Sequence, residues 1–141
     1  MKENQLTIVI PTYNRKERLL NQLDNLFKQE ISKSLKIIIV DNHSNYDVNE
    51  VVRKKYTKIM LSNVKIIVRP FNIGLGAAIT MPFLLCKTDW LWILGDDDEV
   101  KGDLNMVLKD LKRYNDYAYL KYNISNASPQ ENKEIETIED F

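Results

Sequence analysis

The chain has 141 residues, of which 20 are basic, 20 are acidic and 44% are hydrophobic. This length is typical of one domain, and the apolar content is sufficient for a compact core, which excludes a wholly disordered chain. The balanced charge argues against a dedicated nucleic-acid binder and against a protein held to acidic lipids by bulk charge.

The single cysteine, the lack of a long apolar stretch and the lack of a signal-peptide pattern indicate in which cellular compartment we expect the protein. Cys86 cannot form an internal disulfide, and its apolar neighbours predict a buried thiol in a reducing environment. No apolar stretch approaches the roughly 20 residues that span a bilayer. The N-terminus leads directly into a predicted strand, so we expect no signal peptide. The sequence therefore predicts a cytoplasmic protein.

Five short segments predict β-strands because they are rich in β-branched residues and are bounded by turn or cap residues. They are residues 6–10, 35–40, 64–68, 90–94 and 117–122. The first four are almost continuous apolar runs, which is typical of parallel strands covered on both faces.

Helical patterns lie between the strands, and each begins near a cap or turn residue. These residues are Asn14, Asp47, Asn72 and Asp103. Asn14 and Glu17 have the capping-box spacing, and the apolar positions that follow share one helix face. The helix after Asp47 is expected to place on one side Val48, Val51, Val52, Tyr56 and Ile59. Pro82 would cost the third helix about 3 kcal/mol unless the helix kinks or breaks there.

The alternation of strands and helices predicts an α/β fold, with an open, mainly parallel sheet, right-handed crossovers and helices on both faces. Ligands bind such sheets beyond the carboxyl ends of the strands, near the point where the strand order reverses. We assign residues 1–124 to this domain. Residues 125–141 form a polar, acidic tail with too few apolar residues for a core of its own.

The segment after the first strand is rich in positive charge. Arg15, Lys16 and Arg18 lie in the first turn of the predicted helix, where the helix dipole disfavours cations. A bound phosphate would relieve this conflict, because helix N-termini present free N–H groups to anions. The alternative is that these residues are solvated surface cations, and the residues alone leave both interpretations open.

Polar side chains follow the second strand. Asp41, Asn42, Ser44 and Asn45 could hydrogen-bond to a base or a ribose, or they could form a polar turn that caps the next helix. His43 is the only histidine, which excludes a metal site with several histidines and a histidine relay. We expect it to be an exposed loop residue.

Small residues open the helix after the third strand. Gly74, Gly76 and the alanines that follow allow close backbone approach, either of a ligand or of the sheet. The glycine spacing lacks the third glycine of a dinucleotide fingerprint and follows the third strand rather than the first. We therefore do not expect a nicotinamide cofactor.

Four consecutive acids follow the fourth strand, from Asp96 to Glu99. Like charges at the end of a buried strand repel one another unless a cation neutralises them. Hard oxygen ligands of this kind suit Mg²⁺ or Mn²⁺, which would bridge to a diphosphate. The alternative is a solvated acidic turn that leads to the cap at Asp103. The position at the end of the strand favours the metal site.

Taken together, these four segments resemble the family 2 glycosyltransferases, which have the Rossmann-like GT-A fold. The matching residues lie in segments 8–15, 38–44, 72–78 and 93–98. Their order and their positions after successive strands carry the resemblance, which covers residues 6–113. It implies an incomplete GT-A fold, in which the tail begins an acceptor half that is missing here.

The resemblance implies a site for a nucleotide-diphosphate sugar with UDP or GDP as its nucleotide. Its donor-binding residues would be Pro11, Thr12, Tyr13, Asn14, Arg15, Asp41, Asn42, Asn72, Gly74, Asp96 and Asp97. The first three would line the base pocket, and Asp41, with Asn42, would contact the base. In the acidic cluster, which matches the family's DxD motif, Asp97 would lie near the ribose.

The metal of the resemblance, Mn²⁺ or Mg²⁺, would be bound by Asp98 and by Asp96 at the other end of the motif. An inverting transferase also needs a general base, which relatives supply from beyond the donor motif. We assign no catalytic base in this chain, because the later acids belong to a helix, its turn or the tail. They are Asp103, Asp110, Asp116, Glu131, Glu134, Glu136, Glu139 and Asp140.

The function implied is a metal-dependent, inverting transfer of a hexosyl-type sugar to a glycan or lipid-linked acceptor, as in polysaccharide biosynthesis. A cytoplasmic location at the inner face of the membrane is compatible with it, and nucleic acid is not expected as a partner. One alternative is a nucleotide-binding fragment or split subunit without turnover. A weaker alternative is a sugar nucleotidyltransferase, for which no lysine-rich glycine loop follows the first strand.

Overall fold

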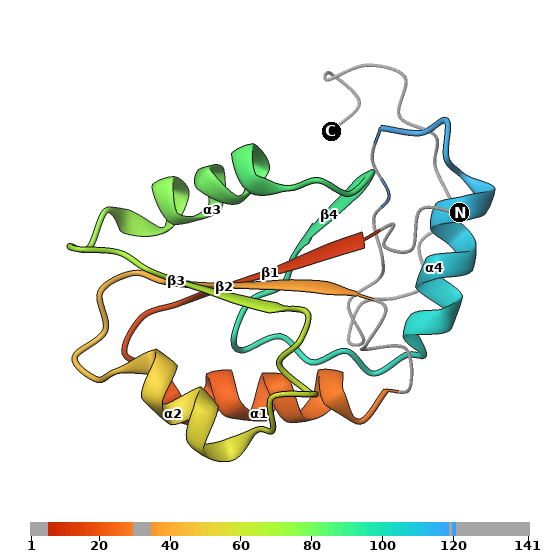
Figure 1. The fold of residues 1–141 in the computed structure, drawn as a ribbon. Helices are drawn as coiled ribbons and strands as arrows, with labels where there is room; N and C mark the ends of the chain where they lie inside the picture. The colour runs from red at the N-terminus through yellow and green to blue at the C-terminus, as the bar shows by residue number, and fades with distance from the viewer. Residues whose placement is uncertain (1–5, 30–34, 119, 121–141) are drawn as a thin grey trace.

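The computed structural model of the chain describes residues 6–29, 35–118 and 120. Within these residues four strands alternate with four helices (Figure 1). The elements are β1 (Leu6–Thr12), α1 (Lys16–Phe27), β2 (Lys36–Asp41), α2 (Val48–Lys55), β3 (Val64–Val68), α3 (Gly74–Leu85), β4 (Trp90–Ile93) and α4 (Leu104–Arg113). The predicted alternation is confirmed over these elements. Residues 117 and 118 of the fifth predicted strand are not in a strand, and most of the others, like residues 125–141, lie outside the described residues.

The four strands form one parallel sheet in the order β3-β2-β1-β4. In its register, Thr12 lies opposite Asp41 and Val9 lies opposite Ile93. The chain proceeds from β1 through β2 to β3 and then crosses to β4 on the other side of β1. The strand order therefore reverses at β1, and the carboxyl ends of β1 and β4 form the place where open sheets bind ligands.

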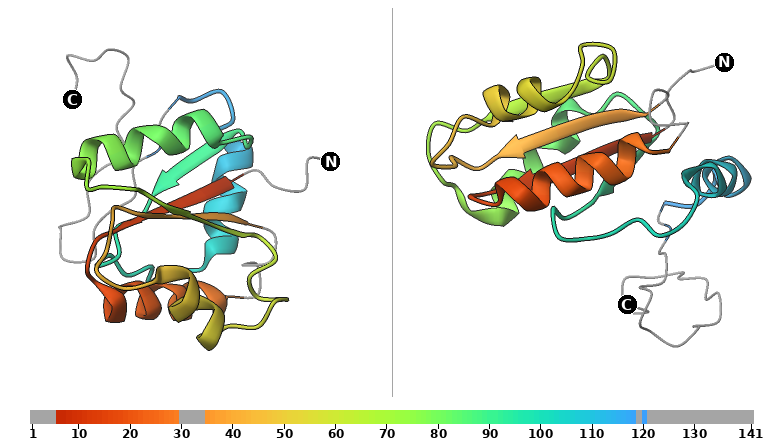
Figure 2. Two further views of the ribbon diagram at one scale, coloured as in Figure 1. Left: turned by 60° about the vertical axis from the view of Figure 1, so that its left-hand side comes forward. Right: turned by 90° about the horizontal axis from the view of Figure 1, so that it is seen from below.

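Helices cover both faces of the sheet, with α1 and α2 on one face and α3 on the other (Figures 1 and 2). Successive side chains of a strand point to opposite faces, so β1 contributes Ile8 and Ile10 to one core and Val9 to the other. Leu104 of α4 lies in the same core as Ile8 and Ile10. The predicted α/β architecture is therefore confirmed.

The start of α1 differs from the predicted capping box. Its N-cap is Arg15, and no side chain makes a capping hydrogen bond there. Asn14 has a φ of 54°, donates its N–H to Ser44 Oγ at 2.9 Å and accepts the Asn45 N–H at 2.7 Å. The Asn14 side chain joins the loops after β1 and β2 and is therefore not available to cap α1. The apolar face was predicted correctly and is buried at Leu19, Leu20, Leu23 and Leu26.

The helices α2 and α4 begin as predicted. Asp47 accepts the Glu50 N–H at 3.0 Å, and Asp103 accepts the Asn105 N–H at 2.8 Å. The apolar face predicted for α2 is wrong at one position: the helix ends before Ile59, which is 71% exposed.

The third helix is continuous, and Pro82 lies within it. The helix ends just beyond this proline, where the Cys86 N–H bonds to Pro82 O at 2.8 Å. Cys86, expected to be buried, is partly exposed, because it follows the helix end, where its Sγ lies 3.1 Å from Thr88 Oγ1. Among the described residues, none of the helices combines the length and the apolar composition that a membrane span needs.

Candidate functional site

The candidate site lies where the carboxyl ends of β1, β2 and β4 meet. Thr12 is the last residue of β1, and Asp41 is the last residue of β2. Leu94, directly after β4, donates its N–H to Val9 O at 2.8 Å, which brings the acidic segment 95–98 toward the end of β1. The sheet therefore places at one edge the polar segments that follow three of the predicted strands.

Asp96 is the buried acid of this segment, with 4% of its side chain exposed. Thr12 Oγ1 donates to Oδ2 of Asp96 at 2.9 Å, and Arg15 Nη1 donates to Oδ1 at 3.0 Å. A buried carboxylate is costly unless it is paired and hydrogen-bonded. Because each oxygen of Asp96 has such a partner, the structure holds a carboxylate charge at the point where the strand order reverses.

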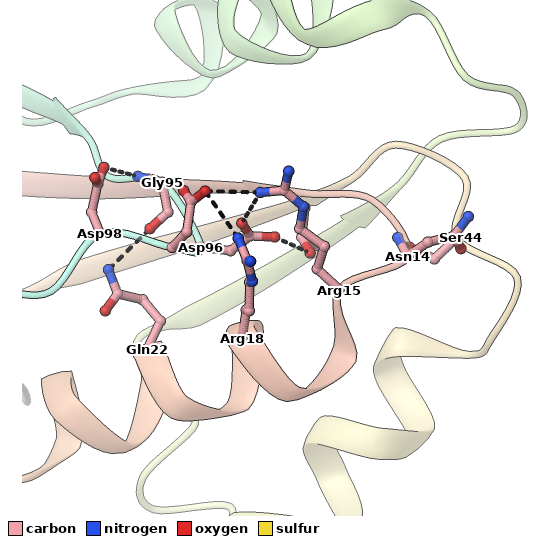
Figure 3. Close-up of polar contacts among 10 residues, drawn as sticks. Asn14, Arg15, Arg18, Gln22, Ser44, Gly95, Asp96 and Asp98 are labelled. Atoms are coloured by element: carbon pink, nitrogen blue, oxygen red, sulfur yellow. Dashed lines mark hydrogen bonds and ion pairs between the residues drawn. The ribbon is translucent and has the colours of Figure 1, made fainter.

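Arg15 and Arg18 converge on the acidic segment (Figure 3). Nη1 of each lies 3.1 Å from Asp97 Oδ2, and the same Arg15 atom binds Asp96. The hydrogen bond to Asp96, followed by the charges of both carboxylates, raises the pKa of Arg15, which stays cationic. The partners of these two cations are thus carboxylates 79 to 82 residues away, and the pattern of neither segment alone reveals this pairing.

Asp98 turns back onto its own loop (Figure 3). Its Oδ2 accepts the Gly95 N–H at 2.9 Å, while Gly95 O accepts a hydrogen bond from Gln22 Nε2 at 3.1 Å. A Cβ at position 95 would lie 2.8 Å from this Asp98 oxygen, so the turn favours glycine. Arg15 joins Asp96 to Asp97, but no described contact brings Asp98 to the same partner. Within the described ranges, no three acidic, histidine or cysteine side chains are grouped so that they could hold a metal.

Asp41 and Asn42 are buried, and their side chains hold neighbouring loops in place. Asp41 Oδ1 accepts the Ser44 N–H at 3.0 Å. Asn42 accepts the Ile73 N–H at 3.0 Å and donates through Nδ2 to Asn72 Oδ1 at 2.8 Å. These bonds support the interpretation of a polar turn for this segment, and contact with a base stays a prediction.

Other residues at this edge are more accessible. Tyr13 is 46% exposed, and Pro11 is partly buried. Gly74 has a φ of 77°, a left-handed conformation that favours glycine, and donates its N–H to Asn72 Oδ1 at 2.9 Å. His43 is exposed, as predicted.

Tyr46 is a residue of this edge that sequence patterns do not single out. Its hydroxyl is buried and makes no hydrogen bond of good geometry, although the hydroxyls of Ser44 and Thr12 are near it. Burial above all raises the pKa of Tyr46, and the carboxylates of Asp41 and Asp96 raise it further. A tyrosine in a capping loop has the pattern of an ordinary core residue, so only the folded chain reveals its position beside the acids.

Comparisons with known proteins agree with this architecture. A family model described as glycosyl transferase family 2 matches residues 7–138. A Trichomonas vaginalis protein named dolichyl-phosphate beta-glucosyltransferase ALG5A is 32% identical over 118 residues, which cover 76% of this chain and 35% of the relative.

Two solved structures share the fold. The mannosyltransferase PcManGT from Pyrobaculum calidifontis, in complex with GDP-Man and Mn²⁺, has a TM-score of 0.66 and 20% identity, covering 76% of this chain and 32% of its own. S. aureus TarS 1-349, in complex with UDP, has a TM-score of 0.68 and 20% identity, covering 79% and 33%. The GT-A fold is confirmed. The chain spans about a third of the length of each of these three proteins.

Proposed function

The chain belongs to glycosyl transferase family 2, and on this premise we propose that it binds a nucleotide-diphosphate sugar for transfer to a glycan or lipid-linked acceptor. The observation that carries the proposal is the buried, ion-paired Asp96 at the point where the strand order reverses. A fixed carboxylate beside two arginines gives this edge both the anionic group that attracts a cation and the cations that attract a diphosphate.

The loops after β1 and β2 would hold the nucleotide. The exposed ring of Tyr13 can stack on a base, and free N–H groups at the start of α1 can bind a phosphate. Arg15 adds positive charge at the same helix end. The GDP-Man and UDP complexes of two proteins with the same fold support a donor of this class.

The carboxylates at this edge suit a hard divalent cation. Mg²⁺ prefers oxygen ligands and is commonly bound by one or two carboxylates together with substrate phosphates. Asp98 and Asp96 would hold Mg²⁺ or Mn²⁺. Asp98 would then give up the hydrogen bond that it accepts from the Gly95 N–H. The Mn²⁺ in the mannosyltransferase complex supports this assignment. The cation supplies stabilisation of the charge that develops on the departing nucleoside diphosphate.

Transfer with inversion also requires a base that accepts the proton of the acceptor hydroxyl. In the described part of the chain we assign no such base, because Asp96 is ion-paired and Asp103 caps α4. The residues described here would therefore bind and orient the donor. We place the hexosyl-type transfer in the cytoplasm, at the inner face of the membrane when the acceptor is lipid-linked.

A second candidate function is donor binding without turnover by this chain. The observation that favours it is the same lack of an assignable base among the described residues. Incubation with a nucleotide sugar and candidate acceptors separates the two functions, since only a transferase releases the free nucleoside diphosphate together with a glycosylated product.

Calorimetry of the purified chain with UDP and GDP, each with and without Mn²⁺, tests the donor site. We expect one nucleotide to bind at least about tenfold more tightly when the cation is present, because the carboxylates would hold a positive charge that attracts the diphosphate. Asp98→Asn should lose this dependence. Asp116→Asn, which removes an exposed acid after α4, should behave as the wild type. Failure of both nucleotides to bind would contradict the proposal, and unchanged binding in Asp98→Asn would contradict the metal assignment.

A further inference from the structure

One guanidinium group bridges two neighbouring acids of the segment after β4. Arg15 Nη1 lies 3.0 Å from Asp96 Oδ1 and 3.1 Å from Asp97 Oδ2, and Arg18 Nη1 adds a second contact to the same Asp97 oxygen. In the structure, therefore, the N-cap residue of α1 and a residue of its first turn neutralise Asp97 and Asp96, and to Asp96 the proposed function assigns the cation.

These two arginines are able to leave without disturbing the core. The side chains of Arg15 and Arg18 are 49% and 57% exposed, whereas that of Asp96 is 4% exposed. An ion pair between two exposed side chains, such as that of Arg18 with Asp97, contributes little net stability. The buried carboxylate is held by Thr12 as well, whose hydroxyl stays in place when the arginine moves. The acid is thus fixed, and its counter-ion is exchangeable.

A divalent cation and a guanidinium group cannot share one carboxylate oxygen without strong repulsion. A cation that binds Asp96 through Oδ1 must therefore displace Arg15. The displaced guanidinium remains at the first turn of α1, where the helix dipole disfavours a cation and favours an anion. A diphosphate is the partner that suits both groups, because guanidinium donors match phosphate oxygens in a two-point geometry.

We propose that Arg15, assisted by Arg18, is an internal counter-cation that exchanges partners. It neutralises Asp96 and Asp97 in the free chain, and it passes to the diphosphate when a divalent cation binds Asp96. This inference rests on the proposed function. Its consequence is positive coupling: the cation alone must compete with Arg15, whereas cation and nucleotide together satisfy every charge, so each raises the affinity for the other.

The test measures two affinities. The first is that for Mn²⁺ alone, monitored by electron paramagnetic resonance, and the second is that for the nucleotide at saturating Mn²⁺. Arg15→Gln removes the charge but keeps donors for Asp96. It should bind Mn²⁺ alone several-fold more tightly, and the nucleotide about tenfold more weakly, than the wild type. Arg18→Gln, which loses only a contact to Asp97, should show smaller changes of the same sign. Arg53→Gln, which removes an exposed arginine at the end of α2, controls for net charge and should change neither affinity.

Equal Mn²⁺ affinity in Arg15→Gln and the wild type would overturn the exchange, as would equal shifts in Arg53→Gln. Thermal unfolding of each variant verifies that it is folded, and Arg18→Gln provides the comparison if Arg15→Gln does not fold. Failure of the proposed function has a different signature, since the wild type itself would then bind neither nucleotide. If the wild type binds nucleotide with Mn²⁺ and Arg15→Gln has the same two affinities, the donor-site proposal stands and only the exchange is excluded.

Discussion

At the scale of single residues, Gly95 sets the shape of the acidic segment. A Cβ at this position would lie 2.8 Å from Asp98 Oδ2 and 2.9 Å from Asp97 Oδ1. These atoms end flexible side chains, so they can move, but Asp98 would then lose its hydrogen bond to the Gly95 N–H. Gly95 thus links the position of the strand end to the orientation of two acids.

Gly95→Ala should therefore lower the free energy of unfolding by about 1 kcal/mol, the net contribution of a typical hydrogen bond. Gly102→Ala is the matched control, because its Cβ would meet no atom within 4 Å. Its free energy of unfolding should change by less than about 0.5 kcal/mol. Urea denaturation measures both. Equal effects in the two variants would show that the contact with Asp98 does not constrain position 95.

At the scale of elements, Tyr56 joins the end of α2 to α1. Its hydroxyl is shared between Leu20 O and Asp24 Oδ1, each at 2.9 Å, and its ring meets that of Phe27 edge-on, with centroids 4.9 Å apart. Burial first, and then the hydrogen bond to Asp24, raises the pKa of Tyr56 far above its usual value. The neutral hydroxyl is therefore part of the packing between these helices.

The sign of the resulting pH dependence follows from this raised pKa. Above pH about 10 the unfolded chain releases the tyrosine proton while the folded chain retains it, so the stability present at lower pH is lost as the pH rises. Denaturation at pH values from about 8 to about 11, which extend from about two units below the usual pKa of tyrosine to about one unit above it, should show this loss. Tyr56→Phe should be less stable than the wild type by about 1 to 2 kcal/mol at pH 8. Its free energy of unfolding should fall less than that of the wild type as the pH rises further. A control, the exposed Tyr13→Phe, should keep the wild-type slope. An unchanged slope in Tyr56→Phe would contradict this assignment.

The outer face of α3 is a second feature of the element scale. The helix contains no charged residue, yet it buries only two of its residues, Ala78 and Pro82. Leu84 is 84% exposed and Phe83 is 58% exposed. The sequence of α3 is apolar all round, so its pattern predicts a helix but does not say which side faces the sheet.

Leu84→Glu should change the free energy of unfolding by less than about 0.5 kcal/mol, because the side chain already faces solvent. Ala78→Glu on the same helix is expected to cost at least about 3 kcal/mol, because it buries a charge without a partner. Urea denaturation of both variants tests the orientation of α3. A large loss in Leu84→Glu would mean that this face is packed.

At the scale of the whole molecule, local patterns predict a parallel sheet and the alternation of its strands with helices. The apolar strands and the caps at Asp47 and Asp103 depend on residues close in sequence, so their spacing is informative. The cap predicted at Asn14 failed because its partners, Ser44 and Asn45, lie on another loop. Contacts between loops depend on how the strands are ordered, and spacing within one segment does not encode that order.

The same limit applied to the site. Cations follow β1 and acids follow β4 in the sequence, and neither segment by itself indicates the other as its partner. The ion pairs of Arg15 with Asp96 and Asp97 arise because β4 lies beside β1 in the sheet. The resemblance to family 2 glycosyltransferases predicts one ligand class for both segments. The proposal that Arg15 is an exchangeable counter-ion depends on contacts that only the folded structure shows.

The central claim is that a nucleotide and a divalent cation bind at the carboxyl ends of β1, β2 and β4. The most direct measurement is a nuclear magnetic resonance titration of the ¹⁵N-labelled chain with UDP or GDP in the presence of Mg²⁺. We predict that the amide signals of residues 12–15, 41–42 and 95–98 shift together and saturate at one nucleotide per chain. Saturable shifts confined to another part of the chain, or none with either nucleotide, would contradict the account.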